Sequence, residues 1–301
     1  MPAVPFPLGR VTRQRGVVLV LVLWVLVLLS VMAASFSYSM RSELRQAGAV
    51  AERAQARALA EAALHYAALH ALHPLPDQYW PVDGTPRRWR YGAGVASIRI
   101  TDIGGKVDLN NADRNLLRNL LAAAGVPVEA QDSLLDAIED FRDPDDLPRL
   151  KGAEKDAYAA QGRVYGPKNA RFESVEELQQ VLGMTPELYR RLAGELTVYS
   201  GMPGINPAAA STRLLKAVLP EVDPRLIEQY VALRQQAAEQ GQPPPAPPFT
   251  SPYLSAAQGV VYHIAADVAL DSGVAAYAEA TVIQGGTPDR LYSLLAWRES
   301  R

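Results

Sequence analysis

The longest apolar segment of the chain lies near its N-terminus. Residues 16–40 contain no charged side chain, and residues 17–29 read VVLVLVLWVLVLL. At about 1.5 Å of rise per residue, an uncharged helix of this length crosses the roughly 30 Å of a bilayer's hydrocarbon core. The helical pattern continues through the alanine-rich residues 41–72 and stops before Pro74. The pattern therefore predicts one long helix whose first half spans a membrane.

Basic residues flank this segment on its N-terminal side. Arg10, Arg13 and Arg15 precede it, and no acidic residue does. By the positive-inside rule the N-terminus stays in the cytoplasm and the bulk of the chain lies outside. The alternative is a secretory signal cleaved near Ala33. The apolar region of a secretory signal is typically only about 7–15 residues long, so the length of the apolar segment in this chain favours a membrane anchor.

Strand patterns occur at two places far apart in the chain. Residues 95–103 alternate apolar and polar side chains, and Val107 and Leu109 follow the Gly104-Gly105 turn, which predicts a hairpin or meander. Alternation returns near the C-terminus, at residues 260–270, 275–283 and 291–297. Isolated hairpins are marginally stable, so we expect the early and late strands to form one antiparallel sheet packed on the N-terminal helix.

The residues between these strands read as helical. DLNNAD, ending at Asp113, and GINPAAA, which contains Asn206, each precede leucines at helical spacing, so we expect asparagine caps and a repeated helical unit. The segment SVEELQQVL starts with a capping box formed by Ser174 and Glu177. Short turns between the helices favour helix-hairpin-helix-like units. The proline-rich residues 240–252 predict a loop that leads back to the sheet.

Composition excludes several classes of function. The 301 residues include 30 basic and 32 acidic side chains and no cysteine, so disulfides, thiolate metal sites and cysteine nucleophiles are ruled out. The net charge of -2 provides no global basic field for nucleic acid. The sequence contains no nucleophile elbow and no glycine-rich phosphate loop after a strand. We therefore expect a protein that is not an enzyme.

The leader RQRGVVLVLVLWVLVLLS resembles that of a type II secretion pseudopilin. The resemblance implies that a prepilin peptidase cleaves after Gly16 and methylates the new N-terminal residue, Val17. Most pseudopilins carry glutamate at the fifth mature position, where this chain has Leu21. The K-type minor pseudopilin lacks that glutamate. An intramembrane carboxylate costs about 2.5–3.5 kcal/mol at a helix centre, so a subunit with no neighbour stacked above it has no use for one.

Further blocks extend the resemblance to the K-type pseudopilin along nearly the whole chain. They are DLNNAD, GINPAAA, FRDPDDLPRLKGAEKDAY, VYGPKNARFESVEEL and LYSLLAWRE. The implied fold is α+β: a long N-terminal transmembrane helix packed on an antiparallel pilin-like sheet, with a large all-α helix-hairpin-helix or SAM-like insertion. The implied parts are a leader (1–16), a transmembrane half-helix (17–40), a periplasmic helix with the first strands (41–109), the insertion (110–250) and the closing strands (251–301).

The resemblance also implies a role and partners. A K-type subunit at the tip of the pseudopilus initiates assembly and caps the filament that exports proteins across the outer membrane. Its partners are the I-type and J-type minor pseudopilins, the prepilin peptidase and the inner-membrane secretion platform. It is a single-pass inner-membrane protein with its bulk in the periplasm. Direct contact with secreted proteins is a weaker implication.

The helical repeat raises an alternative, a membrane-anchored periplasmic receptor for DNA. Helix-hairpin-helix units bind DNA when glycine-rich hairpins direct backbone amides at phosphates. The turns here, such as Gly125-Val126-Pro127, lack paired glycines and a following basic cluster. The sequence therefore favours no nucleic-acid binding.

An acidic block in the insertion is a candidate cation site. Several carboxylates stand on a stretch broken by Pro144, Pro148 and Gly152, and hard oxygens on irregular backbone suit Ca²⁺. The block lacks the EF-hand pattern, and spacing alone slightly favours a solvated acidic turn. The family resemblance shifts this balance toward structural calcium. The ligands that it implies are Asp143, Asp145 and Glu154, with Asn169 a weaker fourth.

Overall fold

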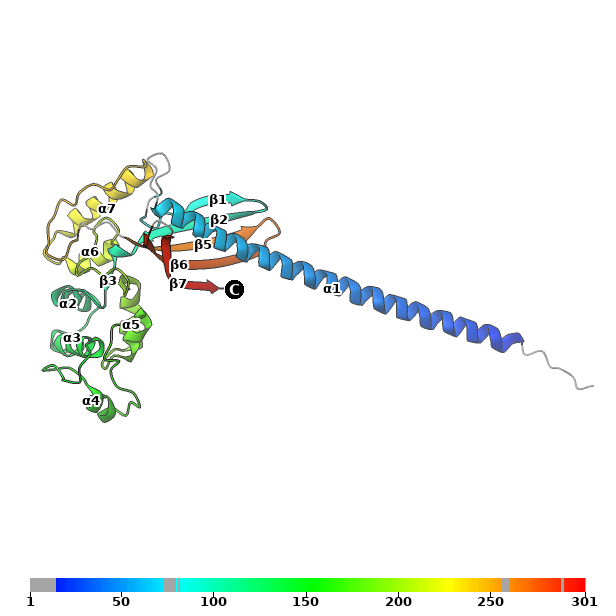
Figure 1. The fold of residues 1–301 in the computed structure, drawn as a ribbon, viewed down its shortest axis with the longest axis horizontal. Helices are drawn as coiled ribbons and strands as arrows, with labels where there is room; N and C mark the ends of the chain where they lie inside the picture. Colours follow the sequence, from blue (N-terminus) through cyan, green and yellow to red (C-terminus); the bar gives the residue numbers. More distant parts are fainter. Residues whose placement is uncertain (1–14, 73–79, 81, 256–259, 288–289, 301) are drawn as a thin grey trace, which may run out of the picture. The chain divides into compact units, whose positions relative to one another are not determined.

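The computed structural model describes residues 15–72, 80, 82–255, 260–287 and 290–300 (Figure 1). It divides into two units, residues 1–55 and 56–301. The helices are α1 (Arg15–Leu72), α2 (Arg114–Ala123), α3 (Val128–Arg142), α4 (Lys155–Ala160), α5 (Pro186–Leu192), α6 (Thr212–Val218) and α7 (Pro224–Glu239). The strands are β1 (Arg87–Tyr91), β2 (Gly94–Asp102), β3 (Val107–Asp108), β4 (Leu196–Thr197), β5 (Val261–Leu270), β6 (Ala275–Thr287) and β7 (Arg290–Ser300).

Helix α1 is continuous, as its sequence pattern predicts. Its first half, which belongs to the first unit, exposes apolar side chains from Val18 to Met40. By length and composition this stretch is able to cross a membrane. Residues 1–14, with Arg10 and Arg13, lie outside the described residues.

The second unit contains a five-stranded antiparallel sheet in the order β1-β2-β5-β6-β7, with the last part of α1 on one face (Figure 1). Small side chains of α1, including Ala56, Ala60 and Ala63, let the helix approach the sheet closely. Ile98 of β2 and Ile264 of β5 are fully buried beneath it. The early and late strands thus form one sheet, as predicted.

Two details of the strand prediction are corrected. The hairpin lies between β1 and β2, and the sequence RRWRY of β1 was not expected to form a strand. Val107 does not continue that sheet, because β3 pairs in parallel with β4 of the insertion. A 3-10 turn, Ile103–Gly105, directs the chain out of the first sheet. The insertion is therefore mainly helical rather than all-α.

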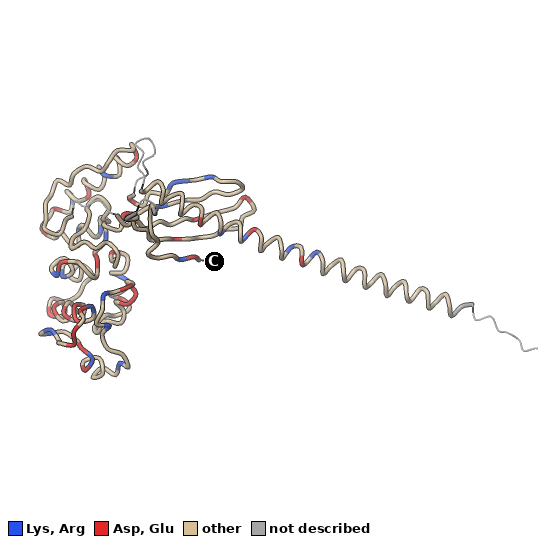
Figure 2. The backbone as a smooth tube through the Cα atoms, viewed as in Figure 1, with Lys and Arg blue, Asp and Glu red and all other residues tan. Residues whose placement is uncertain are grey.

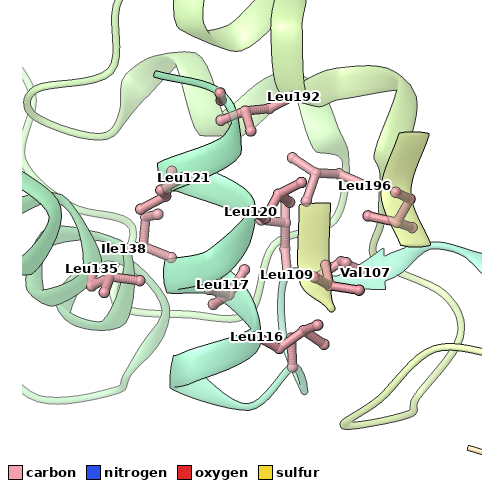
Figure 3. Close-up of a cluster of buried hydrophobic side chains, with 14 of the residues drawn as sticks. Val107, Leu109, Leu116, Leu117, Leu120, Leu121, Leu135, Ile138, Leu192 and Leu196 are labelled. Carbon is pink, nitrogen blue, oxygen red and sulfur yellow. The ribbon is translucent and has the colours of Figure 1, made fainter. Parts of the chain in front are cut away.

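The insertion contains two helix–turn–helix pairs, α2 with α3 and α6 with α7, in line with the repeat in the sequence. Helices α2 and α6 also contact each other. Figure 3 shows Leu116, Leu117 and Leu120 of α2 directed into a core that also receives Leu109 and Leu196. The small β3–β4 sheet therefore belongs to this core.

The predicted caps differ from those observed. Helices α2 and α6 are capped by Asp113 and Ser211, so the preceding asparagines have other roles. Asn110 exchanges two hydrogen bonds with the backbone of Phe172. The segment after Ser174 forms a 3-10 helix, Val175–Gln180, without a side-chain cap. Its Glu177 instead accepts hydrogen bonds from Lys168, which explains the loss of the capping box.

Candidate functional site

The processing and assembly residues lie at the start of α1. Gly16 and Val17 belong to the first turn of the helix. Leu21 is 62% exposed and is surrounded along the helix by other exposed apolar residues. A leucine here adds apolar surface to the helix and carries no charge. This part of the chain can bury against lipid or against other apolar helices, and it provides no group for chemistry.

The acidic block connects α3 to α4, where Figure 2 shows Asp and Glu concentrated. Helix α3 ends at Arg142, so Asp143 begins the irregular stretch, and Glu154 is the residue before α4. Asn169 lies on a later loop with φ of 51°, in the left-handed region that asparagine tolerates better than most residues. The candidate ligands thus come from three places along the chain.

Four oxygen atoms of these residues are buried without a hydrogen-bond partner. They are Oδ1 of Asp143, Oε1 and Oε2 of Glu154 and Oδ1 of Asn169. Glu154 is only 8% exposed. Leaving buried polar atoms unpaired is costly, and carboxylates are strongly unfavourable when buried without a counter-charge. Oxygen atoms of this kind are the donors that a hard cation prefers.

Burial and neighbouring charges raise the pKa of two carboxylates in the acidic block. Burial is the largest effect that raises the pKa of Glu154, to about 7, and the charges of Asp140, Asp143, Asp146 and Asp145 raise it further. Burial likewise raises the pKa of Asp143, although Arg149 opposes the shift. Neighbouring carboxylates repel one another, and a bound cation or a proton on one of them relieves this repulsion.

Asp140 and Asp146 hold the loop in place, although neither was predicted as a ligand. The buried carboxylate of Asp140 accepts hydrogen bonds from the backbone of Arg149 and Ala153. A Cβ at Gly152 would lie 1.9 Å from Oδ2 of Asp140, so only glycine fits there. Asp146 accepts a hydrogen bond from Nδ2 of Asn169 at 2.6 Å, which directs the amide oxygen of Asn169 elsewhere.

The candidate ligands do not all have the same environment. Asp145 is exposed, and its Oδ1 accepts a hydrogen bond from the backbone of Leu147. The other carboxylate oxygen of Asp143, Oδ2, forms an ion pair with Nη2 of Arg149 at 3.0 Å. Within the described residues, no group of three His, Cys, Asp or Glu side chains is arranged to hold a metal ion. A calcium site here therefore depends on the amide oxygen of Asn169 and on backbone oxygens or water as well as on carboxylates.

Comparison with known proteins finds a matching family model and several relatives. Residues 100–201 match the family described as type II secretion system (T2SS), protein K. The type II secretion system protein K of Klebsiella pneumoniae is 28% identical over 256 residues, which cover 75% of this chain and 76% of that protein. The chain is therefore similar to type II secretion system protein K over three quarters of its length. The segment of this chain that matches the family model contains β3, α2, α3 and the whole acidic loop.

Other relatives in the protein K family align over shorter regions. The protein K of Pseudomonas aeruginosa is 30% identical over 165 residues, 52% of this chain and 49% of that protein. A relative from Escherichia coli strain K12 is 28% identical over 199 residues, 60% of this chain. That alignment spans 61% of the relative, which is less than two thirds of its length.

A solved structure shares the fold. It is the crystal structure of the GspK-GspI-GspJ complex from the type 2 secretion system of enterotoxigenic Escherichia coli. The matching chain is 18% identical, with a TM-score of 0.58, and the match covers 87% of this chain and 99% of that chain. The predicted α+β architecture, with its long apolar helix and antiparallel sheet, is thereby confirmed.

Proposed function

We propose that the chain is a minor pseudopilin at the tip of the type II secretion pseudopilus, where it initiates assembly and caps the filament. The observation that carries this proposal is α1, a single helix with an exposed apolar first half and a second half packed on a sheet. Such a helix inserts in the bilayer before assembly and packs against other subunits' helices afterwards. Similarity to type II secretion system protein K supports the role in type II secretion.

Leu21 gives the subunit its proposed place at the tip. A carboxylate at this depth in the membrane costs about 2.5–3.5 kcal/mol unless a partner receives it. A subunit that leads the filament has no neighbour above it whose N-terminal amine would need such a carboxylate. The bulky insertion would also keep another subunit from docking above. The chain contributes packing to secretion, and we assign it no catalytic residue.

The proposed partners follow from the same role. They are the I-type and J-type minor pseudopilins, the prepilin peptidase and the inner-membrane secretion platform. The solved structure with the same fold is itself a complex of three such proteins, which supports the first two. The three arginines before the apolar segment support a cytoplasmic N-terminus, with the bulk of the chain in the periplasm.

Calcium is the proposed cofactor, with a structural role. Asp143, Glu154 and Asn169 would hold it through their unpaired buried oxygens, with Asp145 a fourth ligand at the exposed side. Bound calcium supplies the positive charge that these oxygens lack. Asp140 fixes the loop on which Asp143 and Glu154 lie, because its carboxylate accepts a hydrogen bond from the backbone of Ala153.

Mass analysis of the mature N-terminus tests the proposal. Peptidase processing predicts a mature protein that begins with methylated Val17. An N-terminus near Ala34 would instead indicate an ordinary exported protein. Deletion of the gene from its own bacterium is expected to stop export by the type II system, and the wild-type chain is expected to restore it. A Gly16→Glu variant, which the peptidase would not cleave, is expected to fail in that assay.

A further inference from the structure

Arg149 supplies positive charge to the acidic block but is not one of the proposed calcium ligands. Its Nε lies 3.0 Å from Oε2 of Glu139 and 3.5 Å from Oδ1 of Asp140, and its Nη2 lies 3.0 Å from Oδ2 of Asp143. The side chains of these three acids are at most 20% exposed, whereas that of Arg149 is 42% exposed. One partly exposed guanidinium therefore contacts three largely buried carboxylates.

The backbone of Arg149 is fixed more firmly than its side chain. Its backbone N–H donates to the carboxylate of Asp140, with distances of 3.2 and 3.3 Å to the two oxygens. Asp140 has no exposed surface, so water does not compete for this bond. The guanidinium is instead held by ion pairs that water reaches, and such pairs contribute little to stability. The side chain can therefore turn toward solvent while the loop keeps its backbone path.

Asp143 is the carboxylate that depends most on this guanidinium. Glu139 also forms an ion pair with Nη1 of Arg114 at 2.6 Å, and Asp140 accepts hydrogen bonds from the backbone of the loop. Among the described residues, Arg149 is the only side chain paired with Oδ2 of Asp143, and Oδ1 is buried without a partner. Movement of Arg149 would thus free one carboxylate oxygen and leave the other two acids with partners.

Asp143 has no free oxygen at the surface while Arg149 keeps this position, because Oδ1 is buried and Oδ2 is paired. A Ca²⁺ ion binds carboxylate oxygens at about 2.3–2.6 Å, and its two charges would repel a guanidinium on the same carboxylate. We propose that Arg149 competes with calcium for Asp143: its Nη2 holds Oδ2 in the calcium-free protein and leaves it when the cation binds. This role rests on the proposed structural calcium, which Asp143 and Glu154 would help to hold.

Calorimetric titration of calcium into the full chain, held in phosphatidylcholine nanodiscs after chelator treatment, tests this competition. Arg149→Gln removes the guanidinium and leaves every proposed ligand in place. We expect its Kd for calcium to be about tenfold lower than that of the wild type, because no ion pair has to break before the cation binds. The matched control is Arg118→Gln, which removes an arginine of similar exposure whose Nη2 lies 2.8 Å from Oδ1 of Asp132. This control is expected to leave the Kd unchanged.

Thermal unfolding gives a second readout. In chelator, Arg149→Gln is expected to lower the unfolding midpoint, because Asp143 loses its counter-charge. Saturating calcium is expected to recover most of that loss, since the bound cation then supplies positive charge to the same carboxylate. Arg149→Lys keeps a charge but lacks the planar fork that reaches both Glu139 and Asp143, so its Kd and midpoint should lie between those of the wild type and Arg149→Gln. The lysine variant also preserves the test if the glutamine variant does not fold.

The outcomes separate the role of Arg149 from the calcium site itself. If the wild type binds calcium and Arg149→Gln binds it equally or more weakly, competition by Arg149 is wrong and the calcium site stands. A loss of midpoint that saturating calcium leaves unchanged overturns the competition in the same way. If neither the wild type nor the variants bind calcium, the proposed calcium site is wrong, and the role of Arg149 is wrong with it.

Discussion

Asn206 donates a hydrogen bond from its side-chain amide to the carboxylate of Asp102, over 3.0 Å, although 104 residues separate them. Asp102 ends β2, and Asn206 stands where the chain enters the second helical pair. The backbone N–H of Asn206 also donates to the carbonyl oxygen of Gly104 at 2.7 Å. The start of the insertion is therefore tied to the start of its second repeat by buried polar contacts.

Replacement of this asparagine is expected to loosen the insertion. Asn206→Ala removes the bond to Asp102 and the bond that the amide oxygen accepts from the backbone of Ala208. Removal of one partner of a buried hydrogen bond typically costs about 1–3 kcal/mol, and we expect the free energy of unfolding to fall by an amount in that range. Urea unfolding measures it. Asn115→Ala, at an exposed position of α2, is the control. A loss no larger than that of the control would contradict the structural role.

Gly105 is expected to tolerate no side chain. A Cβ there would lie 2.4 Å from the carbonyl carbon of Ala209, which is backbone and unable to rotate away. Overpacking of this kind typically costs about 1–3 kcal/mol, so Gly105→Ala should lower the unfolding midpoint clearly. Gly194→Ala is the matched control, because nothing lies within 4 Å of its added Cβ. Equal unfolding midpoints for the two variants would contradict the close approach of Gly105 to the backbone of Ala209.

Calcium is expected to raise the thermal unfolding midpoint of the chelator-treated protein. A ligand at a hundredfold excess over its Kd stabilises the folded state by about 2.7 kcal/mol. Asp143→Asn and Glu154→Gln each remove a charge from the proposed donor set, so both variants should lose most of the shift. Glu187→Gln, whose carboxylate is in an exposed pair with Arg191, should keep it. An unchanged midpoint in the wild type would leave the acidic block a solvated turn.

Leu21→Glu is expected to change where the subunit is placed in the filament. The added carboxylate would seek a neighbour's N-terminal amine and so favour positions below the tip. Fluorescent labelling of the subunit in assembled pseudopili measures its distribution along their length. We expect the tip preference and the number of initiated filaments to fall. Leu23→Gln, also in the apolar stretch, is the control for added polarity. Filaments indistinguishable from wild type would refute the proposed function of Leu21.

Acid is expected to destabilise the sheet through His263. Burial lowers the pKa of His263 below its usual 6.5, an effect opposed by Glu279 and reinforced by Lys106, Arg298 and Arg99. The unfolded chain therefore binds this proton more readily than the folded chain does. The contribution of neutral His263 to the free energy of unfolding is complete above pH 6.5. It is lost as the pH falls from there toward the pKa of His263 in the folded state. Urea unfolding between pH 7.5 and 5 measures it, and His263→Gln should flatten that dependence.

The local pattern of apolar and polar residues predicts many of the helices and strands of this protein. The uncharged run before Met40 predicts α1, because a helix that spans a bilayer has to exclude charge over its whole length. Alternation predicts β2, β5, β6 and β7, because successive side chains of a strand face opposite sides of a sheet. The ligand candidates Asp143, Glu154 and Asn169 came from the sequence by way of a family resemblance, and the structure leaves a buried oxygen unpaired on each.

Tertiary structure decided what depends on contacts between distant residues. The parallel pairing of Val107 with Leu196, and the use of Asn206 to bind Asp102, join positions about a hundred residues apart, so no local period encodes them. A cleft beside α7 exists for the same reason, since its walls meet only when the insertion and the sheet have folded. Sequence determines which segments form helices and strands; burial and long-range hydrogen bonds determine which polar groups remain available to bind a ligand.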